Sequence, residues 1–169
     1  MIKYKPDTVQ VVFEEIPDEV TLAIEITNCP GMCEGCHSPW LREDIGEKLT
    51  VGRLSDLIDQ NKGITCICFM GEGKDPEALK SLAFSIHLRN DFPYKVALYS
   101  GRDEVEQDYD RFFDYIKVGP YIPSRGPLNK DTTNQRLYEV EWLYDKDDMA
   151  NGTIKTRRHD ITYKFWNKQ

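Results

Sequence analysis

The chain has 169 residues, 40% hydrophobic and 30% charged, which is the size of one ordinary domain with a buried core, so we expect a single domain over residues 1–169. Its formal charge of −7 gives no electrostatic basis for binding a polyphosphate backbone, and we expect no nucleic-acid partner. No apolar run approaches the roughly 20 residues that a membrane span requires, and we expect no membrane partner.

The N-terminus and the cysteines favour a cytoplasmic location. Lys3 and Lys5 are followed by Glu14 and Glu15 without the apolar stretch of a secretory signal. The five cysteines are an odd number, and three of them lie within eight residues, which suits a metal site in a reducing compartment better than a disulfide framework. We therefore expect a cytoplasmic protein.

Strands and helices are predicted to alternate along most of the chain. Residues 20–27 alternate in the β manner, are rich in branched side chains, and run directly into the first cysteine of the group. Further strands are predicted at 64–70 before Gly71, 94–99 before Ser100-Gly101, and 115–118 before Gly119. Helical patterns separate them at residues 54–58, 79–86 and 105–113. This order predicts an α/β fold with right-handed crossovers around a mainly parallel sheet, in which chemistry gathers where strands end.

The C-terminal third is predicted to hold a loop and then a β hairpin. Residues 121–134 contain Pro123, Gly126 and Pro127 and little periodicity, which is typical of a surface loop. β character resumes at 137–144 and at 161–166, and these two runs are separated by Asn151-Gly152, a strong turn signal. We expect a C-terminal hairpin or a pair of edge strands.

Three cysteines form the most specific feature of the sequence. Cys29, Cys33 and Cys36 are separated by three and then two residues, so one tight loop can bring three thiolates together. Gly31 and Gly35 allow the backbone to wrap closely. A four-iron cluster normally takes four cysteine ligands, so three leave one iron open to a substrate or cofactor.

A structural zinc site and three unrelated thiols are the alternatives. A closed zinc site needs a fourth ligand, which His37 could supply only awkwardly, and no second Cys-x-x-Cys pair is present. Cys66 and Cys68 have the wrong spacing and lie on a predicted buried strand, where thiols serve mainly for packing. An iron–sulfur cluster is the interpretation that the spacing favours.

The cysteine loop after the first strand resembles the signature of the radical S-adenosylmethionine enzymes. Three segments are more narrowly similar to the activating proteins of anaerobic ribonucleoside-triphosphate reductase: Cys33-Glu34-Gly35-Cys36-His37-Ser38-Pro39, Asp114-Tyr115-Ile116-Lys117-Val118-Gly119-Pro120-Tyr121, and Thr133-Asn134-Gln135-Arg136. The similarity runs from about Thr21 to Tyr138. The cysteine spacing marks the superfamily, and the later segments together select this family.

The resemblance implies a fold, a reaction and partners. The fold is a partial, incomplete β/α barrel of mainly parallel strands. A 4Fe–4S cluster held by Cys29, Cys33 and Cys36 binds the amino and carboxylate groups of S-adenosylmethionine at its open iron. One electron, from an external donor such as flavodoxin or ferredoxin, breaks the carbon–sulfur bond to give methionine and a 5′-deoxyadenosyl radical. That radical takes a hydrogen atom from a glycine of the large subunit of anaerobic ribonucleotide reductase, so this oxidoreductase acts on a protein backbone.

The resemblance also implies cofactor contacts around the cysteine loop. Backbone groups at Gly35, Cys36 and His37 meet the adenine in this family, although a lone histidine is as often a surface residue. Gly71-Glu72-Gly73 stands where the family has a glycine-rich acidic motif that receives the cofactor's amino group. Glu72 replaces an expected glycine, so the register is firmest at Gly71, and a plain strand-to-helix turn is the alternative.

Two later strand ends are predicted to line the same cofactor site as the cysteine loop. Ser100-Gly101 ends the third strand and Lys117 lies near the end of the fourth, so both positions favour a cofactor role, with ordinary turns as the alternative. The segment 133–136 has polar groups that can either hold the long loop down or contact the partner. Rival functions for the whole chain are an activase of another glycyl radical enzyme, of the formate-lyase type, and a non-catalytic iron–sulfur or zinc module.

Overall fold

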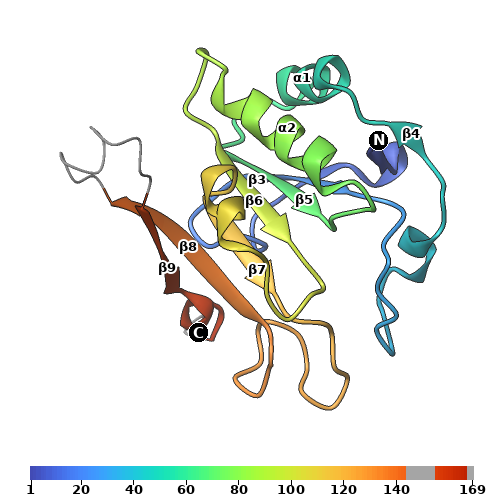
Figure 1. The fold of residues 1–169 in the computed structure, drawn as a ribbon, viewed down its shortest axis with the longest axis vertical. Helices are drawn as coiled ribbons and strands as arrows, with labels where there is room; N and C mark the ends of the chain where they lie inside the picture. Colours follow the sequence, from blue (N-terminus) through green and yellow to red (C-terminus); the bar gives the residue numbers. More distant parts are fainter. Residues whose placement is uncertain (144–154, 167–169) are drawn as a thin grey trace.

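The computed structural model describes residues 1–143 and 155–166, and its main feature is a seven-stranded mixed sheet (Figure 1). The strand order is β2 (Gln10–Val12), β3 (Thr21–Glu25), β5 (Cys66–Met70), β6 (Lys95–Tyr99), β7 (Tyr115–Val118), β8 (Arg136–Leu143) and β9 (Lys155–Asp160). The four central strands, β3, β5, β6 and β7, run parallel, whereas β2, β8 and β9 pair antiparallel to their neighbours. A separate two-stranded sheet joins β1 (Lys3–Tyr4) to β4 (Glu47–Lys48).

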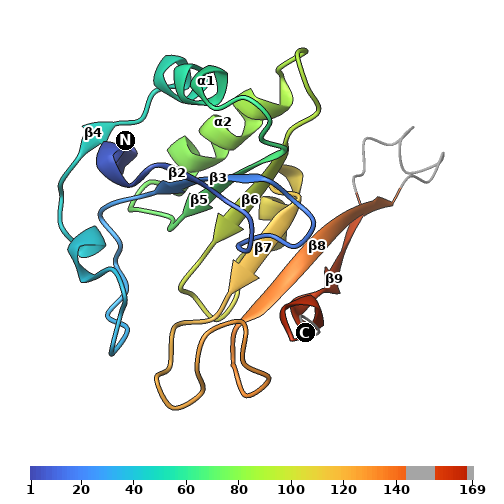
Figure 2. The same ribbon diagram turned by 180° about the vertical axis from the view of Figure 1, so that it is seen from behind.

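Both α-helices of the described residues, α1 (Val51–Gln60) and α2 (Pro76–His87), cover the same face of the sheet (Figures 1 and 2). Each begins at a side chain that accepts a backbone N–H of the first turn: Thr50 accepts from Arg53 and Asp75 from Ala78, both at 3.1 Å. Their buried apolar residues recur at helical spacing, namely Leu54, Leu57, Ile58, Leu79, Leu82, Ala83 and Ile86. No helix in the described part of the chain is long and apolar enough to cross a membrane.

The predicted partial β/α barrel of mainly parallel strands is wrong. Three of the six neighbouring strand pairs are antiparallel, and residues 1–143 and 155–166 contain two α-helices rather than one after each strand. The helical pattern at 105–113 forms only a short 3-10 helix, η3 (Gln107–Arg111). Antiparallel strands need no crossover helix, so β2 and β8–β9 extend the parallel centre as an open, mostly sheet fold.

The C-terminal strands differ from the prediction in their second member. β8 matches the predicted run, but the predicted strand at 161–166 is wrong because 162–165 form the 3-10 helix η4 (Thr162–Phe165). β9 precedes it and pairs with β8 from Tyr138↔Asp160 to Leu143↔Lys155. β9 is a charged edge strand. Because it contains no apolar residue, no hydrophobic pattern in the sequence indicates a strand there. Tyr144 and the predicted turn Asn151-Gly152 lie outside the described residues.

The sheet separates two apolar clusters, and one row of its residues lies at the carboxyl ends of the parallel strands, next to the candidate site. Beneath the helices pack Leu22, Ile24, Ile67, Phe69, Val96, Leu98 and Ile116; on the other face pack Cys66, Cys68, Ala97, Tyr115, Leu137, Ile161 and Phe165. At the carboxyl ends of the parallel strands, the register places Glu25, Met70, Tyr99 and Lys117 side by side. Alternation puts this row on the face that lacks the α-helices.

Candidate functional site

The three cysteines lie on a closed loop at the carboxyl end of β3. Two backbone hydrogen bonds close its base, from the N–H of Asn28 to the carbonyl of Glu43 at 3.1 Å and from the N–H of Cys29 to that of Leu41 at 2.8 Å. The 3-10 helix η2 (Pro39–Arg42) forms the returning side. We call residues 29–41 the cysteine loop.

The thiols of the cysteine loop line one cavity of about 80 Å³, which Met70 and Gly71 close from the end of β5. Gly31 leaves room for the sulfur atoms, because a Cβ there would lie 3.3 Å from the Sγ of Cys29 and 3.9 Å from the Sγ of Cys33. The N–H of Gly31 points toward the Cys29 Sγ at 3.4 Å. The local backbone therefore turns two sulfur atoms toward the same space.

The donor set of this cavity has the ligand chemistry of an iron–sulfur cluster, because such clusters are held by cysteine thiolates. The side chains are not gathered around one point: in the described residues no three His, Cys, Asp or Glu side chains are placed so that they could hold a metal ion. The cavity is lined by the three thiols, by apolar Ile26, Leu41 and Met70, and by Ser38 and Arg42; no histidine or carboxylate of the described residues lines it. Thiolate ligands in an apolar surround are the setting of iron–sulfur clusters.

His37 and Gly35 face a second loop rather than the thiol cavity. The ring of His37 packs against Tyr121 with centroids 4.7 Å apart. A Cβ at Gly35, whose φ is +67°, would lie 3.0 Å from the Cγ of Pro123. His37 also lines a cavity of about 600 Å³ together with Tyr99 and Lys117, on the side of the sheet that lacks the α-helices.

Lys117 is a buried cation at the edge of that second cavity. Its Nζ donates to the carbonyl of Gly119 at 2.8 Å and to that of Ser100 at 3.3 Å, and lies 5.8 Å from the centre of the Tyr99 ring. No carboxylate of the described residues forms an ion pair with it. Burial lowers the pKa of Lys117 to about 8. An anionic group of a ligand would balance this charge.

Replacing Lys117 by methionine should stabilise the protein without cofactors. Because burial lowers the pKa of Lys117 from 10.5 to about 8, the charge destabilises the folded state below pH 8, and this penalty disappears as the pH rises to 10.5. We expect Lys117→Met to raise the free energy of unfolding by about 1–3 kcal/mol at pH 7. Urea unfolding at pH 7 and 10.5 measures this. Lys95→Met, on an exposed side chain of β6, is the control, and a loss of stability in Lys117→Met at pH 7 would contradict the burial argument.

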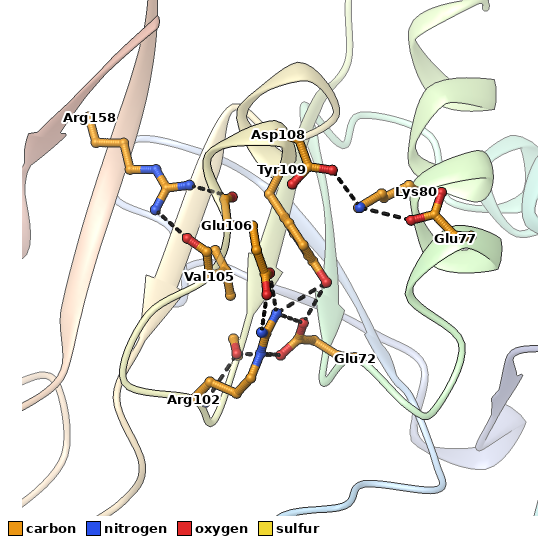
Figure 3. Close-up of polar contacts among 10 residues, drawn as sticks. Glu72, Glu77, Lys80, Arg102, Val105, Glu106, Asp108, Tyr109 and Arg158 are labelled. Atoms are coloured by element: carbon orange, nitrogen blue, oxygen red, sulfur yellow. Dashed lines mark hydrogen bonds and ion pairs between the residues drawn. The ribbon is translucent and has the colours of Figure 1, made fainter.

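Glu72 points into a network of donors (Figure 3). Its carboxylate accepts from Arg102 Nε at 3.0 Å, Arg102 Nη2 at 2.8 Å, the hydroxyl of Tyr109 at 3.0 Å, and the hydroxyl of Ser100. Burial by itself raises the pKa of the Glu72 carboxyl, but the hydrogen bonds from Arg102 and Ser100 outweigh it, so the pKa is lowered. The carboxylate thus has its partners within the chain.

Replacing Glu72 by glutamine should lower the free energy of unfolding at pH 7 and reduce the loss of that free energy as the pH falls. The lowered pKa means that the contribution of Glu72 is complete above about pH 4.5 and is lost as the pH falls through the folded-state pKa. We expect Glu72→Gln to cost about 1–3 kcal/mol at pH 7, since charge-assisted hydrogen bonds are lost. Chemical unfolding from pH 7 to 3 checks this, with exposed Glu104→Gln as the control. An unchanged acid dependence in Glu72→Gln would argue against the network.

The predicted cofactor residues therefore divide among three places. Cys29, Cys33, Cys36 and Gly71 share the thiol cavity; His37 and Lys117 share the second cavity; Glu72 and Gly73 line a third, of about 600 Å³, which Pro30 of the cysteine loop also lines. Ser100 is buried beside Glu72, and its N–H donates to the carbonyl of Lys117 at 2.8 Å. Gly101 is exposed, with nothing within 4 Å of its Cβ position.

Three residues that contact the predicted site residues were not predicted to be part of the site. Arg102 directly follows Ser100-Gly101, and this position just past a strand end is the signal in the sequence that indicates it. Arg42 donates from Nη2 to the carbonyl of Cys33 at 2.8 Å and lines the thiol cavity. Tyr121 packs on His37. The last two depend on contacts between loops, which no local pattern reveals.

Comparison with known proteins does not place the chain in a family. No protein-family model, no curated protein and no solved structure matches it. Its function is therefore inferred from the cysteine motif and from the geometry around it.

Proposed function

We propose that this chain is a radical S-adenosylmethionine activase that generates a glycyl radical on an anaerobic ribonucleoside-triphosphate reductase. The observation that carries the proposal is that the thiols of Cys29, Cys33 and Cys36 line one apolar cavity, closed by the end of β5. The three sequence segments similar to the activating proteins of that reductase select the partner among glycyl radical enzymes.

The chain's own residues would bind and orient the cofactors. Cys29, Cys33 and Cys36 would hold a 4Fe–4S cluster, and Arg42 fixes the loop between them through the carbonyl of Cys33. When bound, such a cluster supplies the electron that cleaves S-adenosylmethionine into methionine and a 5′-deoxyadenosyl radical. Gly71 has a φ of +113° and no side chain, so its backbone can approach a ligand closely.

Charge and compartment support the same proposal. Lys117 offers a buried ammonium group to an anionic group of a ligand at the second cavity. Three thiols without a disulfide among the described cysteines suit a reducing compartment, so we place the protein in the cytoplasm, with a flavodoxin or ferredoxin as its electron donor.

Electron paramagnetic resonance of a reductase partner tests the proposed function. The chain is loaded anaerobically with iron and sulfide, then incubated with the large subunit, S-adenosylmethionine and a reductant. We expect a glycyl radical signal that is absent when the acceptor glycine of the partner is replaced by alanine. A signal only with a formate-lyase-type enzyme would overturn the choice of partner. No signal with either enzyme, together with intact S-adenosylmethionine, would indicate an electron-transfer or metal-binding module.

A further inference from the structure

The segment between β7 and β8, residues 119–134, is a loop whose two ends are fastened together. The Nδ2 of Asn134 donates to the carbonyl of Pro120 at 2.9 Å, and the Nε2 of Gln135 donates to that of Gly119 at 3.4 Å. Gly119 has a φ of +102°, and a Cβ there would lie 3.0 Å from the Cα of Gln135. The ends of the loop therefore approach as closely as backbone allows, and the amides of 134 and 135 close the gap.

The same loop packs on the cysteine loop. Both project from the same end of the sheet in Figures 1 and 2. Tyr121, one residue past the fastened end, contacts the ring of His37, and Pro123 leaves no room for a side chain at Gly35. Cys36 stands between these two contacted residues. A change in the position of the 119–134 loop would therefore reach Cys36 through its two neighbours in the chain.

The fastened end also carries an acceptor for Lys117. The carbonyl of Gly119 receives both the Nζ of Lys117 at 2.8 Å and the Nε2 of Gln135. Gln135 is buried, as is Lys117. Gln135 thus fixes the carbonyl of Gly119, which orients the Lys117 ammonium at the second cavity. The side-chain amides of Asn134 and Gln135 are therefore connected to the cysteine loop on one side and to Lys117 on the other.

We propose that Asn134 and Gln135 are positioning residues for the cysteine loop. They close the ends of the 119–134 loop so that Tyr121 and Pro123 stay packed on His37 and Gly35, which holds Cys36 in place. Of the two roles that the sequence offered for the segment 133–136, this is the first, holding the long loop down, and it extends that role to the cysteine loop. It acts through the neighbouring loop, not by contact with a cofactor.

Hydrogen exchange in the chain without cofactors tests this inference independently of any cluster. Asn134→Ala and the isosteric Asn134→Asp both remove the donor to Pro120. We expect exchange to become about fivefold faster in peptides covering residues 29–41 as well as 119–134, since loss of one net hydrogen bond raises local opening by roughly that factor. Peptides covering β5 should stay protected, which shows that the variants fold. Thr132→Ala is the control, because it removes a bond to the carbonyl of Arg125 within the loop and leaves the ends fastened.

A second pair of variants tests the contact itself. Tyr121→Leu removes the ring that packs on His37, whereas Tyr121→Phe keeps it. We expect only Tyr121→Leu to speed exchange in residues 29–41. If the Asn134 variants loosen residues 119–134 alone, or if both Tyr121 variants leave residues 29–41 unchanged, Asn134 and Gln135 serve only their own loop and the inference is overturned.

Cluster loading adds an arm that rests on the proposed function. After reconstitution with iron and sulfide, we expect Asn134→Asp to retain several-fold less iron per chain than Thr132→Ala. Equal iron in both variants would contradict a role in holding Cys36. If the unaltered chain itself binds no cluster, the proposed function fails, while the exchange experiment still decides the positioning role.

Discussion

Replacing Cys33 by alanine should reduce formation of 5′-deoxyadenosine from S-adenosylmethionine to the background of the assay. The three thiols are the only cysteine, histidine or carboxylate groups among the described residues that line the cavity, so no equivalent ligand there can replace Cys33. Loss of one thiolate leaves two, too few to retain a four-iron cluster. We therefore expect iron and sulfide content to fall together with activity in Cys33→Ala.

Cys68→Ala is the matched control for this experiment. It removes an equally small thiol from β5, where Cys68 is fully buried on the face that lacks the α-helices, outside the thiol cavity but 3.5 Å from the sulfur of Met70, and burial raises its pKa well above the usual value. We expect a modest loss of stability, with cluster loading and cofactor cleavage retained. If Cys33→Ala cleaved the cofactor at the unaltered rate, or if Cys68→Ala lost activity equally, the cysteine loop would not be the site.

The second large effect is expected at Arg158, which joins the edge strand β9 to η3. Asp110 is 1% exposed and accepts from Arg158 Nε at 2.6 Å and from the hydroxyl of Thr156 at 2.7 Å. Arg158 also donates to the carbonyls of Val105 and Glu106 at 3.2 and 3.0 Å (Figure 3). Arg158→Ala should lower the free energy of unfolding by about 3 kcal/mol, because it leaves the Asp110 carboxylate buried without its cation.

A double-mutant cycle separates this pair from its surroundings. Urea unfolding of Arg158→Ala, Asp110→Asn and the double variant gives the coupling energy, and we expect the double variant to lose less stability than the two single variants together. The matched control is Arg157→Ala, which truncates the exposed neighbouring arginine of β9 and should change stability by less than about 0.5 kcal/mol. A similarly small effect in Arg158→Ala would contradict a stabilising buried pair.

The sequence predicted the central strands well because their burial leaves a local mark. β5 and β6 are covered on both faces, so each appears as a continuous apolar run ending at a glycine or serine. β9 leaves no such mark: its residues are polar or charged, and it is a strand only because β8 lies beside it. The barrel prediction failed for the same reason, since strand direction depends on pairing between distant segments.

The helical pattern at 105–113 failed for a related reason. Tyr109 and Phe113 are spaced as on a helix, and their rings do stack, with centroids 5.9 Å apart. Between them, Asp110 is buried by Arg158 of a distant strand, and the segment forms only the short η3. A tertiary ion pair thus contributes to a backbone shape that local periodicity could not predict.

The site itself was only partly predictable. Spacing along the chain determines that three thiols can meet, and the structure places all three around one cavity. Glu72 was predicted from its place after β5, but its orientation depends on Arg102 and Tyr109, which come from another connection. Side chains whose direction is set by distant partners cannot be placed from a local motif.

Cleavage of S-adenosylmethionine by the reconstituted chain alone is the most direct test of the central claim. The protein is loaded anaerobically with iron and sulfide, its iron content is measured, and a strong reductant is added with the cofactor. We expect 5′-deoxyadenosine and methionine in equal amounts by mass spectrometry. If a chain with a full cluster leaves S-adenosylmethionine intact, the cysteine loop is not that of a radical S-adenosylmethionine enzyme.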